Sequence, residues 1–448
     1  MSSQKYHFIK EVRALLALAI PLAGAQLVMC LAGFVDTLMA SHYSTTDLAA
    51  VAIGYTTWIP INVFLIGLLI AKTAFVAQLV GAGQYRNIPA LVHQGFRLAL
   101  AAGCIGLILL YLSPCLLGYT GLNQQAQHIA TGYLHAVAWG MPGVALNQVL
   151  RSYMEGQGRT RSVMIIQVLS LGLNIPFNYA MIYGKWGFPE MGGVGCGYAT
   201  ALIMWLAPIF MTIYIKCNHS LKQTTPLKKL TPIDFPHIRE LVRVGLPVGC
   251  TLSLQFLVFT LITLLVTPLG EKVVGANQIA FNFSTLPFVI PSAIGGALTI
   301  QVGKAIGAGN RHHARIRGHI GMITGSGIAL ICALAIWSFS YFIVTLYTND
   351  PIIIEQANNL MLFVAFYHIL SSLQQITASS LRGYKDTRAV MFITVFSLWG
   401  IALPLGYCLA RTNWLTSAMG ISGFWLAIVL AFFIAVLLTQ LRFYRISH

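Results

Sequence analysis

Long apolar segments, separated by short polar ones, recur along the whole chain. A helix crosses the apolar core of a bilayer with about 20 such residues. The apolar runs are continuous, as at 103–112 and 328–344, whereas the strands of a membrane barrel alternate in polarity. The pattern predicts an all-α polytopic membrane protein with twelve transmembrane helices, at 14–40, 47–80, 95–113, 125–152, 161–184, 192–216, 239–267, 275–302, 316–347, 352–380, 388–410 and 418–441.

Composition supports a lipid environment. Of the 448 residues 57% are hydrophobic and 8% are charged, while soluble domains have about 25% charged residues. The eight cysteines are scattered and form no CxxC pair. They read as small packing residues, so we expect neither disulfides nor a resident metal or organic cofactor.

The distribution of basic residues predicts orientation. Nearly all Lys and Arg fall in alternate connecting segments, including Lys228 and Lys229 in the polar segment 217–238, and the opposite segments hold only Lys185, Lys272 and Arg411. By the positive-inside rule both termini should be cytoplasmic. The net charge of +16 therefore requires no nucleic-acid partner.

The two halves of the chain match at a nearly constant offset. Pro21 pairs with Pro247, the triplet 81–83 (GAG) with 307–309, and Pro176 with Pro404. Six helices per repeat give both halves the same orientation, so we expect two parallel bundles around a central cleft. The predicted organisation is an N-lobe at 1–216, a cytoplasmic linker at 217–238 and a C-lobe at 239–448. Such a duplication favours a transporter over a receptor or a single-bundle channel.

Of the eleven acidic residues, ten lie in connecting segments or at the ends of predicted helices, and Asp36 is the one within a span. An ionisable group in the membrane is costly and is by default a functional candidate. The alternative is an interfacial carboxylate that reaches water at the outer end of the first helix.

Polar partners for Asp36 occur in the fifth and sixth helices. Asn174 and Asn178 share one helix face across Pro176, and Thr200 lies at comparable depth. A carboxylate, two amide oxygens and a hydroxyl suit a hard cation such as Na+, and the carboxylate could take a proton instead. Hydrogen bonding between helices is the structural alternative for the asparagines.

No P-loop or ATPase-sized segment is present in the sequence, so transport would be driven by an ion gradient or by the substrate itself. An enzyme acting within the membrane would need a cluster of catalytic groups in the spans, and a sensor would need a sensory domain. Neither is evident.

Several segments resemble the multidrug and toxic compound extrusion (MATE) family, closest to its NorM-like subfamily. They are 20–40, YMEGQGRTR at 153–161, 174–201, GLPVG at 245–249, GANQIA at 275–280 and SLRGYKDT at 380–387. The resemblance implies the MATE fold, a bacterial inner-membrane location, and antiport of cationic amphipathic compounds against Na+ or H+. It also implies a coupling site at Asp36, Asn174, Asn178 and Thr200.

The second half departs from the NorM-like pattern. The family's glutamate in the seventh helix corresponds to Gln255, and its aspartate in the tenth to Ser371 or Ser372. Coupling should therefore rest on Asp36, and these three residues remain candidates for substrate contact. A lipid-linked precursor flippase is the second hypothesis, although the spans offer only Lys72 to hold a pyrophosphate. A monomer would suffice for either function.

Overall fold

The computed structural model describes residues 2–119, 123–227, 231–414 and 417–448, which are helical almost throughout. Lys228 and Lys229 of the predicted linker lie outside the described residues. Within those ranges eleven helices are long and apolar enough to cross a membrane. The chain is thus a multi-pass, all-α membrane protein.

The chain divides into two compact units. We call Gly24–Gly249 the N-unit and Met1–Ala23 with Cys250–His448 the C-unit. The helix α1 (Ser2–Tyr43) contributes to both units, and so does α9 (Phe235–Val266).

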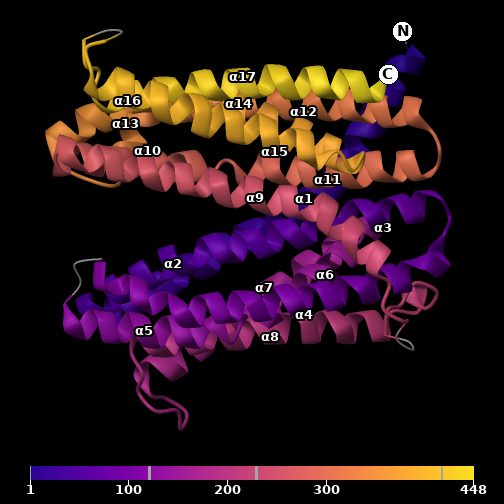
Figure 1. The fold of residues 1–448 in the computed structure, drawn as a ribbon, viewed down its shortest axis with the longest axis horizontal. Helices are drawn as coiled ribbons and strands as arrows, with labels where there is room; N and C mark the ends of the chain where they lie inside the picture. Colours follow the sequence, from indigo (N-terminus) through magenta and orange to yellow (C-terminus); the bar gives the residue numbers. More distant parts are fainter. Residues whose placement is uncertain (1, 120–122, 228–230, 415–416) are drawn as a thin grey trace. The chain divides into compact units, whose positions relative to one another are not determined.

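The remaining N-unit helices include the long spans of the first repeat, which run side by side in Figure 1. They are α2 (Thr45–Ile70), α3 (Lys72–Gly81), α4 (Ile88–Leu112), α5 (Gln124–Ala138), α6 (Met141–Gln157), α7 (Thr160–Tyr183) and α8 (Gly193–Cys217). Short 3₁₀ turns connect them at Tyr85–Asn87, Ser113–Tyr119 and His219–Leu221.

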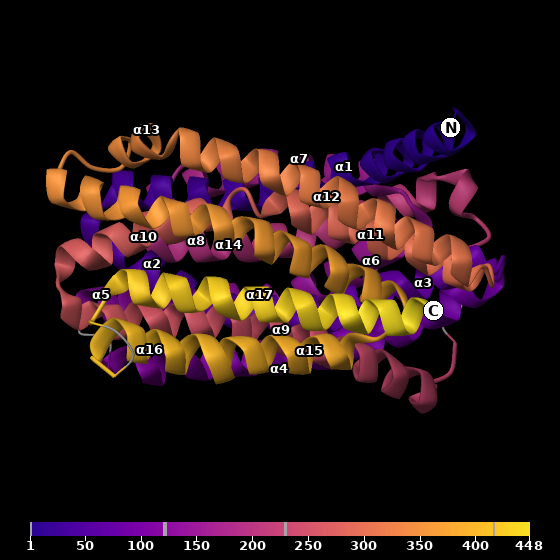
Figure 2. The same cartoon turned by 90° about the horizontal axis from the view of Figure 1, so that it is seen from above.

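The C-unit repeats this order. Its helices are α10 (Glu271–Thr285), α11 (Val289–Gly307), α12 (Arg311–Ser338), α13 (Ser340–Thr345), α14 (Pro351–Gly383), α15 (Thr387–Val395), α16 (Leu403–Arg411) and α17 (Ile421–Ser447), with a 3₁₀ turn at Thr267–Leu269. The central helix is α14, which packs against α10, α11, α12 and α17 (Figure 2).

The predicted fourth span, 125–152, is divided into α5 and α6, and neither part alone has the length of a span. The turn at Trp139–Gly140 is followed by Pro142 in the first turn of α6, where its missing N–H costs no helical hydrogen bond. Gly143 then packs so closely on α8 that a Cβ atom there would lie 2.7 Å from the Met204 carbonyl oxygen. The equivalent helix of the second repeat, α14, is unbroken.

A second irregularity lies in the predicted span 388–410. A π-helical segment, Phe396–Ala402, separates α15 from α16 just before Pro404. Pro176, its counterpart in the first repeat, lies inside the continuous α7. A proline removes one backbone donor, and a wider turn is one way to accommodate the loss.

The unit borders differ from the predicted lobes, because each repeat begins inside the other unit. The borders, after Ala23 and after Gly249, each lie two residues beyond the repeated prolines Pro21 and Pro247. Residues 1–23 therefore belong with the second half of the chain, and the first part of α9 belongs with the first half.

The described parts of the predicted linker, 217–227 and 231–238, belong to the N-unit. His93 and Gln94 of α4 bind the carbonyl oxygens of Pro226 and Pro232 at 2.7 and 2.9 Å. Arg97 also donates to Pro232, at 2.9 Å. These bonds satisfy carbonyl groups of the loop. The loop continues into α9, which begins at Phe235.

Candidate functional site

Asp36 accepts hydrogen bonds from two helices of the N-unit other than its own. Asn178 Nδ2 of α7 lies 2.6 Å from Asp36 Oδ1, and Thr200 Oγ1 of α8 lies 3.1 Å from Asp36 Oδ2. The carboxylate is therefore bonded at both oxygens inside the unit. This geometry disfavours the reading of Asp36 as a merely interfacial carboxylate.

Asn174 completes the cluster from one turn earlier on α7. Its Oδ1 accepts from Asn178 Nδ2 at 3.1 Å. The Asn178 amide nitrogen thus donates to oxygens of both Asp36 and Asn174. The Asn178 Oδ1 is buried and has no hydrogen-bond partner among the described residues. All four residues predicted for the N-lobe site, Asp36, Asn174, Asn178 and Thr200, come together.

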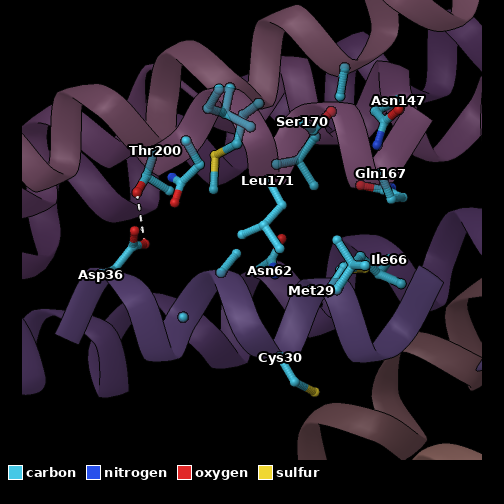
Figure 3. A pocket seen from close by; sticks show the side chains of 18 of the residues that line it. Met29, Cys30, Asp36, Asn62, Ile66, Asn147, Gln167, Ser170, Leu171 and Thr200 are labelled. Carbon is cyan, nitrogen blue, oxygen red and sulfur yellow. Dashed lines mark hydrogen bonds between the residues drawn. The ribbon is translucent and has the colours of Figure 1, made fainter. Parts of the chain in front are cut away.

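A cavity of about 360 Å³ extends from this cluster through the interior of the N-unit. Its size is within the range of small-molecule sites. Asp36 and Thr200 lie at one end, and Asn147 and Gln167 lie at the other (Figure 3). Its lining comes from α1, α2, α6, α7 and α8.

One wall of the cavity is aromatic. Tyr55 and Trp58 of α2 meet edge to face with their ring centroids 5.7 Å apart. The Trp58 indole N–H donates to the Tyr133 hydroxyl at 3.2 Å, which fixes the ring orientation. Such a wall can bind flat apolar cations through ring faces.

The far end of the cavity is polar, and sequence analysis did not identify it. Asn147 and Gln167 lie there, and Asn62, Gln148, Arg151 and Ser170 also line the cavity, with Asn62 near its middle (Figure 3). The amide oxygens of Asn62 and Asn147 are buried and have no hydrogen-bond partner among the described residues. A search for neutral amides inside apolar runs would have found them, because such groups need partners in a membrane.

Arg151, at the end of the predicted span 125–152, is a basic residue of the cavity that sequence analysis did not single out. It is 8% exposed within α6 and lines the cavity. Its Nε donates to Glu155 Oε1 at 2.5 Å. The pairing neutralises a buried guanidinium that would otherwise carry a large desolvation cost.

The residues predicted for the C-lobe are not brought together in this way. The Ser371 and Ser372 hydroxyls both donate to the His368 carbonyl oxygen of their own helix, α14. Gln255 lies half-buried on α9. No hydrogen bond in the described part of the chain joins it to either serine, and their contact with substrate stays a prediction.

Comparison with known proteins identifies the family. The MatE family model matches residues 21–180 and 247–408, one segment in each repeat. The multidrug resistance protein MdtK of Edwardsiella ictaluri is 40% identical over 98% of this chain and 96% of its own. The probable multidrug resistance protein NorM of Shewanella oneidensis is 38% identical over 96% and 94%.

Solved structures share the fold at lower identity. The eukaryotic MATE transporter AtDTX14 superposes with a TM-score of 0.87 at 18% identity, covering 97% of this chain and 96% of that one. An outward-facing multidrug resistance MATE transporter of the MOP superfamily gives 0.87 at 21% identity with the same coverage. The family match and the near-full-length relatives together show that this chain belongs to the MATE family, in its NorM-like branch.

Proposed function

We propose that this protein is a secondary active multidrug antiporter that exports cationic amphipathic compounds in exchange for Na+ or H+. The observation that carries the proposal is the carboxylate of Asp36 at the end of an otherwise neutral or charge-paired cavity. Relatives named for multidrug resistance support the substrate class. The flippase alternative gains no support, because Arg151, the basic residue lining the cavity, is paired with Glu155.

The four-residue cluster would hold the coupling ion. Asp36, Asn174 and Thr200 offer oxygens, and rotating the Asn178 amide would direct its unpartnered oxygen toward Asp36. The resulting set of oxygen ligands suits Na+. The same rotated oxygen could accept a hydrogen bond from protonated Asp36, so the cluster could serve either ion.

Substrate would occupy the remainder of the cavity. The Tyr55 and Trp58 rings would take the flat apolar part of the compound. The unpartnered oxygens of Asn62 and Asn147 would accept hydrogen bonds from its polar groups. Ion and substrate would then compete for one cavity, and such negative coupling between two ligands is a basis for exchange.

Ion binding from outside would shift or bend α1, and the cavity would contract and release substrate. The proline within α1, Pro21, motivates this step, since it weakens the helix two residues before the unit border. Outward-facing structures with the same α1 at high and low pH, and with and without Na+, would contradict it.

The first experiment is efflux of a fluorescent cationic dye from cells that express wild type, Asp36→Asn or Glu190→Gln at matched membrane abundance. Glu190 is the control, because it is an exposed carboxylate of the same unit that binds the Tyr43 hydroxyl outside the cavity. We expect export by wild type and Glu190→Gln, and loss of export in Asp36→Asn. Omitting Na+ identifies the ion. Equal export by all three would reject Asp36 as the coupling residue.

A further inference from the structure

A groove of about 430 Å³ runs along the C-unit between α12 and α17. Both helices pack along α14 and contact each other little, so the groove is open on the side away from α14. Figures 1 and 2 show the three helices side by side. This groove is separate from the N-unit cavity and plays no part in the proposed exchange.

The middle of the groove is mainly apolar, with Gln440 as a polar exception. Met322 and Ile323 of α12 face Leu437 and Leu441 of α17 across it. Ile323 and Leu441 are 62% and 58% exposed, so they would contact lipid in a membrane. From Leu437 to Tyr444 the groove extends about 10 Å along α17, at about 1.5 Å per residue.

One end of the groove is basic and rich in hydrogen-bond donors. His319 lines this end, and its ring packs edge-on against Phe443 at 5.5 Å. Arg315 lies one turn earlier than His319 on the same face of α12. Tyr444 completes this end of the groove, and its ring lies tilted against that of His448 with the centroids 4.0 Å apart.

Two carboxylates of the C-unit, Glu11 and Asp386, form ion pairs with arginines other than Arg315. Glu11 accepts from Arg317 Nε at 3.1 Å, and Asp386 accepts from Arg442 Nε at 2.7 Å. Among the described residues no acidic group pairs with Arg315. Its guanidinium is therefore an uncompensated positive charge beside an apolar groove in the membrane-facing surface.

We propose that this groove binds an anionic phospholipid. One acyl chain would lie along Ile323 and Leu441, and the phosphate would bind Arg315 and His319. A guanidinium presents a planar fork of donors that matches phosphate oxygens, and basic pockets between transmembrane helices bind anionic head groups. A zwitterionic lipid would fill the same apolar groove but gain less from the unpaired charge.

The test is lipid binding to the purified full-length protein in detergent, measured by native mass spectrometry. The probes are phosphatidylglycerol and phosphatidylcholine with identical acyl chains. We expect phosphatidylglycerol to bind roughly fivefold or more tightly, the preference that one well-placed basic residue supplies. Added salt should reduce that preference.

Three variants separate the head-group contact from the groove itself. Arg315→Gln should remove the preference for phosphatidylglycerol, and Ile323→Trp, which fills the groove, should weaken binding of both lipids. Arg388→Ala, which removes an exposed charge from α15 of the same unit, should leave both unchanged. Thermal unfolding without added lipid verifies that each variant is folded. The proposal is overturned if wild type shows no preference, or if Arg388→Ala reduces it as much as Arg315→Gln.

Discussion

Asp36 is held by side chains from two helices that are distant from it in sequence, Asn178 of α7 and Thr200 of α8. Each donor stabilises the charged carboxylate inside an apolar unit. Neither donor carries a charge. An ion could therefore replace one of these hydrogen bonds to Asp36 without leaving a charged donor unpaired. This property would let one small cluster alternate between an occupied and an empty state.

Thr200→Val should weaken ion coupling without altering shape, because it replaces only the hydroxyl that donates to Asp36 Oδ2. A lost hydrogen bond of about 1 kcal/mol corresponds to about a fivefold higher ion concentration for half-maximal exchange. Measurement of dye exchange in proteoliposomes against ion concentration tests this. Thr212→Val is the control, since the Thr212 hydroxyl donates to the Pro208 carbonyl oxygen of its own helix. An unchanged ion dependence in Thr200→Val would show that Thr200 is not a ligand.

Lys72 is a buried charge that the cavity does not use. Its side chain is 2% exposed, its Nζ has no hydrogen-bond partner among the described residues, and the Phe96 ring centroid lies 6.0 Å away. One cation–π contact offsets only part of the desolvation cost of an ammonium group. The folded state shown here therefore carries an energetic penalty at Lys72.

Lys72→Met should therefore stabilise the protein by about 1–3 kcal/mol, since a methionine side chain fills similar space without a charge. Thermal unfolding in detergent would detect a higher midpoint. Lys216→Met, at an exposed position of α8, should change stability little. A lower midpoint for Lys72→Met would mean that the ammonium group stabilises the fold through a contact not seen here.

Helix packing in the N-unit relies on close backbone approach at glycines. Gly67 of α2 faces Gly249 of α9, and a Cβ atom on Gly67 would lie 2.6 Å from the Gly249 Cα. Gly245 approaches the Leu68 carbonyl in the same way. Small residues allow helices to approach closely in a membrane, where no hydrophobic force drives them together. This explains why the GLPVG segment has a glycine at each end.

Gly67→Ala should destabilise the N-unit by about 1–3 kcal/mol, because backbone atoms cannot move aside as a flexible side chain can. Gly172→Ala is the matched control, since no atom lies within 4 Å of a Cβ placed there and alanine favours helix. The comparison requires only the two thermal midpoints. Equal thermal midpoints for Gly67→Ala and Gly172→Ala would show that the close contact between α2 and α9 does not contribute to stability.

At the scale of the molecule, each repeat donates the start of its first helix to the other unit. Residues 1–23 are attached to the C-unit through Glu11, which is 7% exposed and accepts from His313 Nε2 at 3.0 Å as well as from Arg317. The start of α9 is attached to the N-unit through Arg97 and its neighbours on α4. A rearrangement of either unit would therefore involve a helix, α1 or α9, that continues into the other unit.

Glu11→Gln should lower stability by about 1–3 kcal/mol and expose the start of α1 to protease, because it removes a buried carboxylate that pairs with Arg317 and also binds His313. Asp386→Asn breaks a pair with the more exposed Arg442 and should cost less than about 1 kcal/mol. Limited proteolysis combined with thermal unfolding would compare the two. If Asp386→Asn is the more damaging variant, Glu11 does not anchor α1.

Asp36, Asn174, Asn178 and Thr200 could be predicted because polar groups within an apolar run are conspicuous and share helix faces. Asn62, Asn147 and Arg151 were missed for a physical reason. Neutral amides are common at helix interfaces, and an arginine near a helix end normally reaches water. Only the packing of α2 and α6 around one cavity distinguishes these three residues from their many counterparts elsewhere.

The sequence by itself determined the membrane environment, the helical architecture and the duplicated order of spans, because these depend on composition and on periodic patterns along the chain. The tertiary structure alone decided where the units divide and that α5 and α6 are separate. It also decided that Arg151 lines a cavity and pairs with the Glu155 carboxylate. Those features depend on which backbones approach closely in space, and apolar residues facing lipid and facing protein look alike in the sequence.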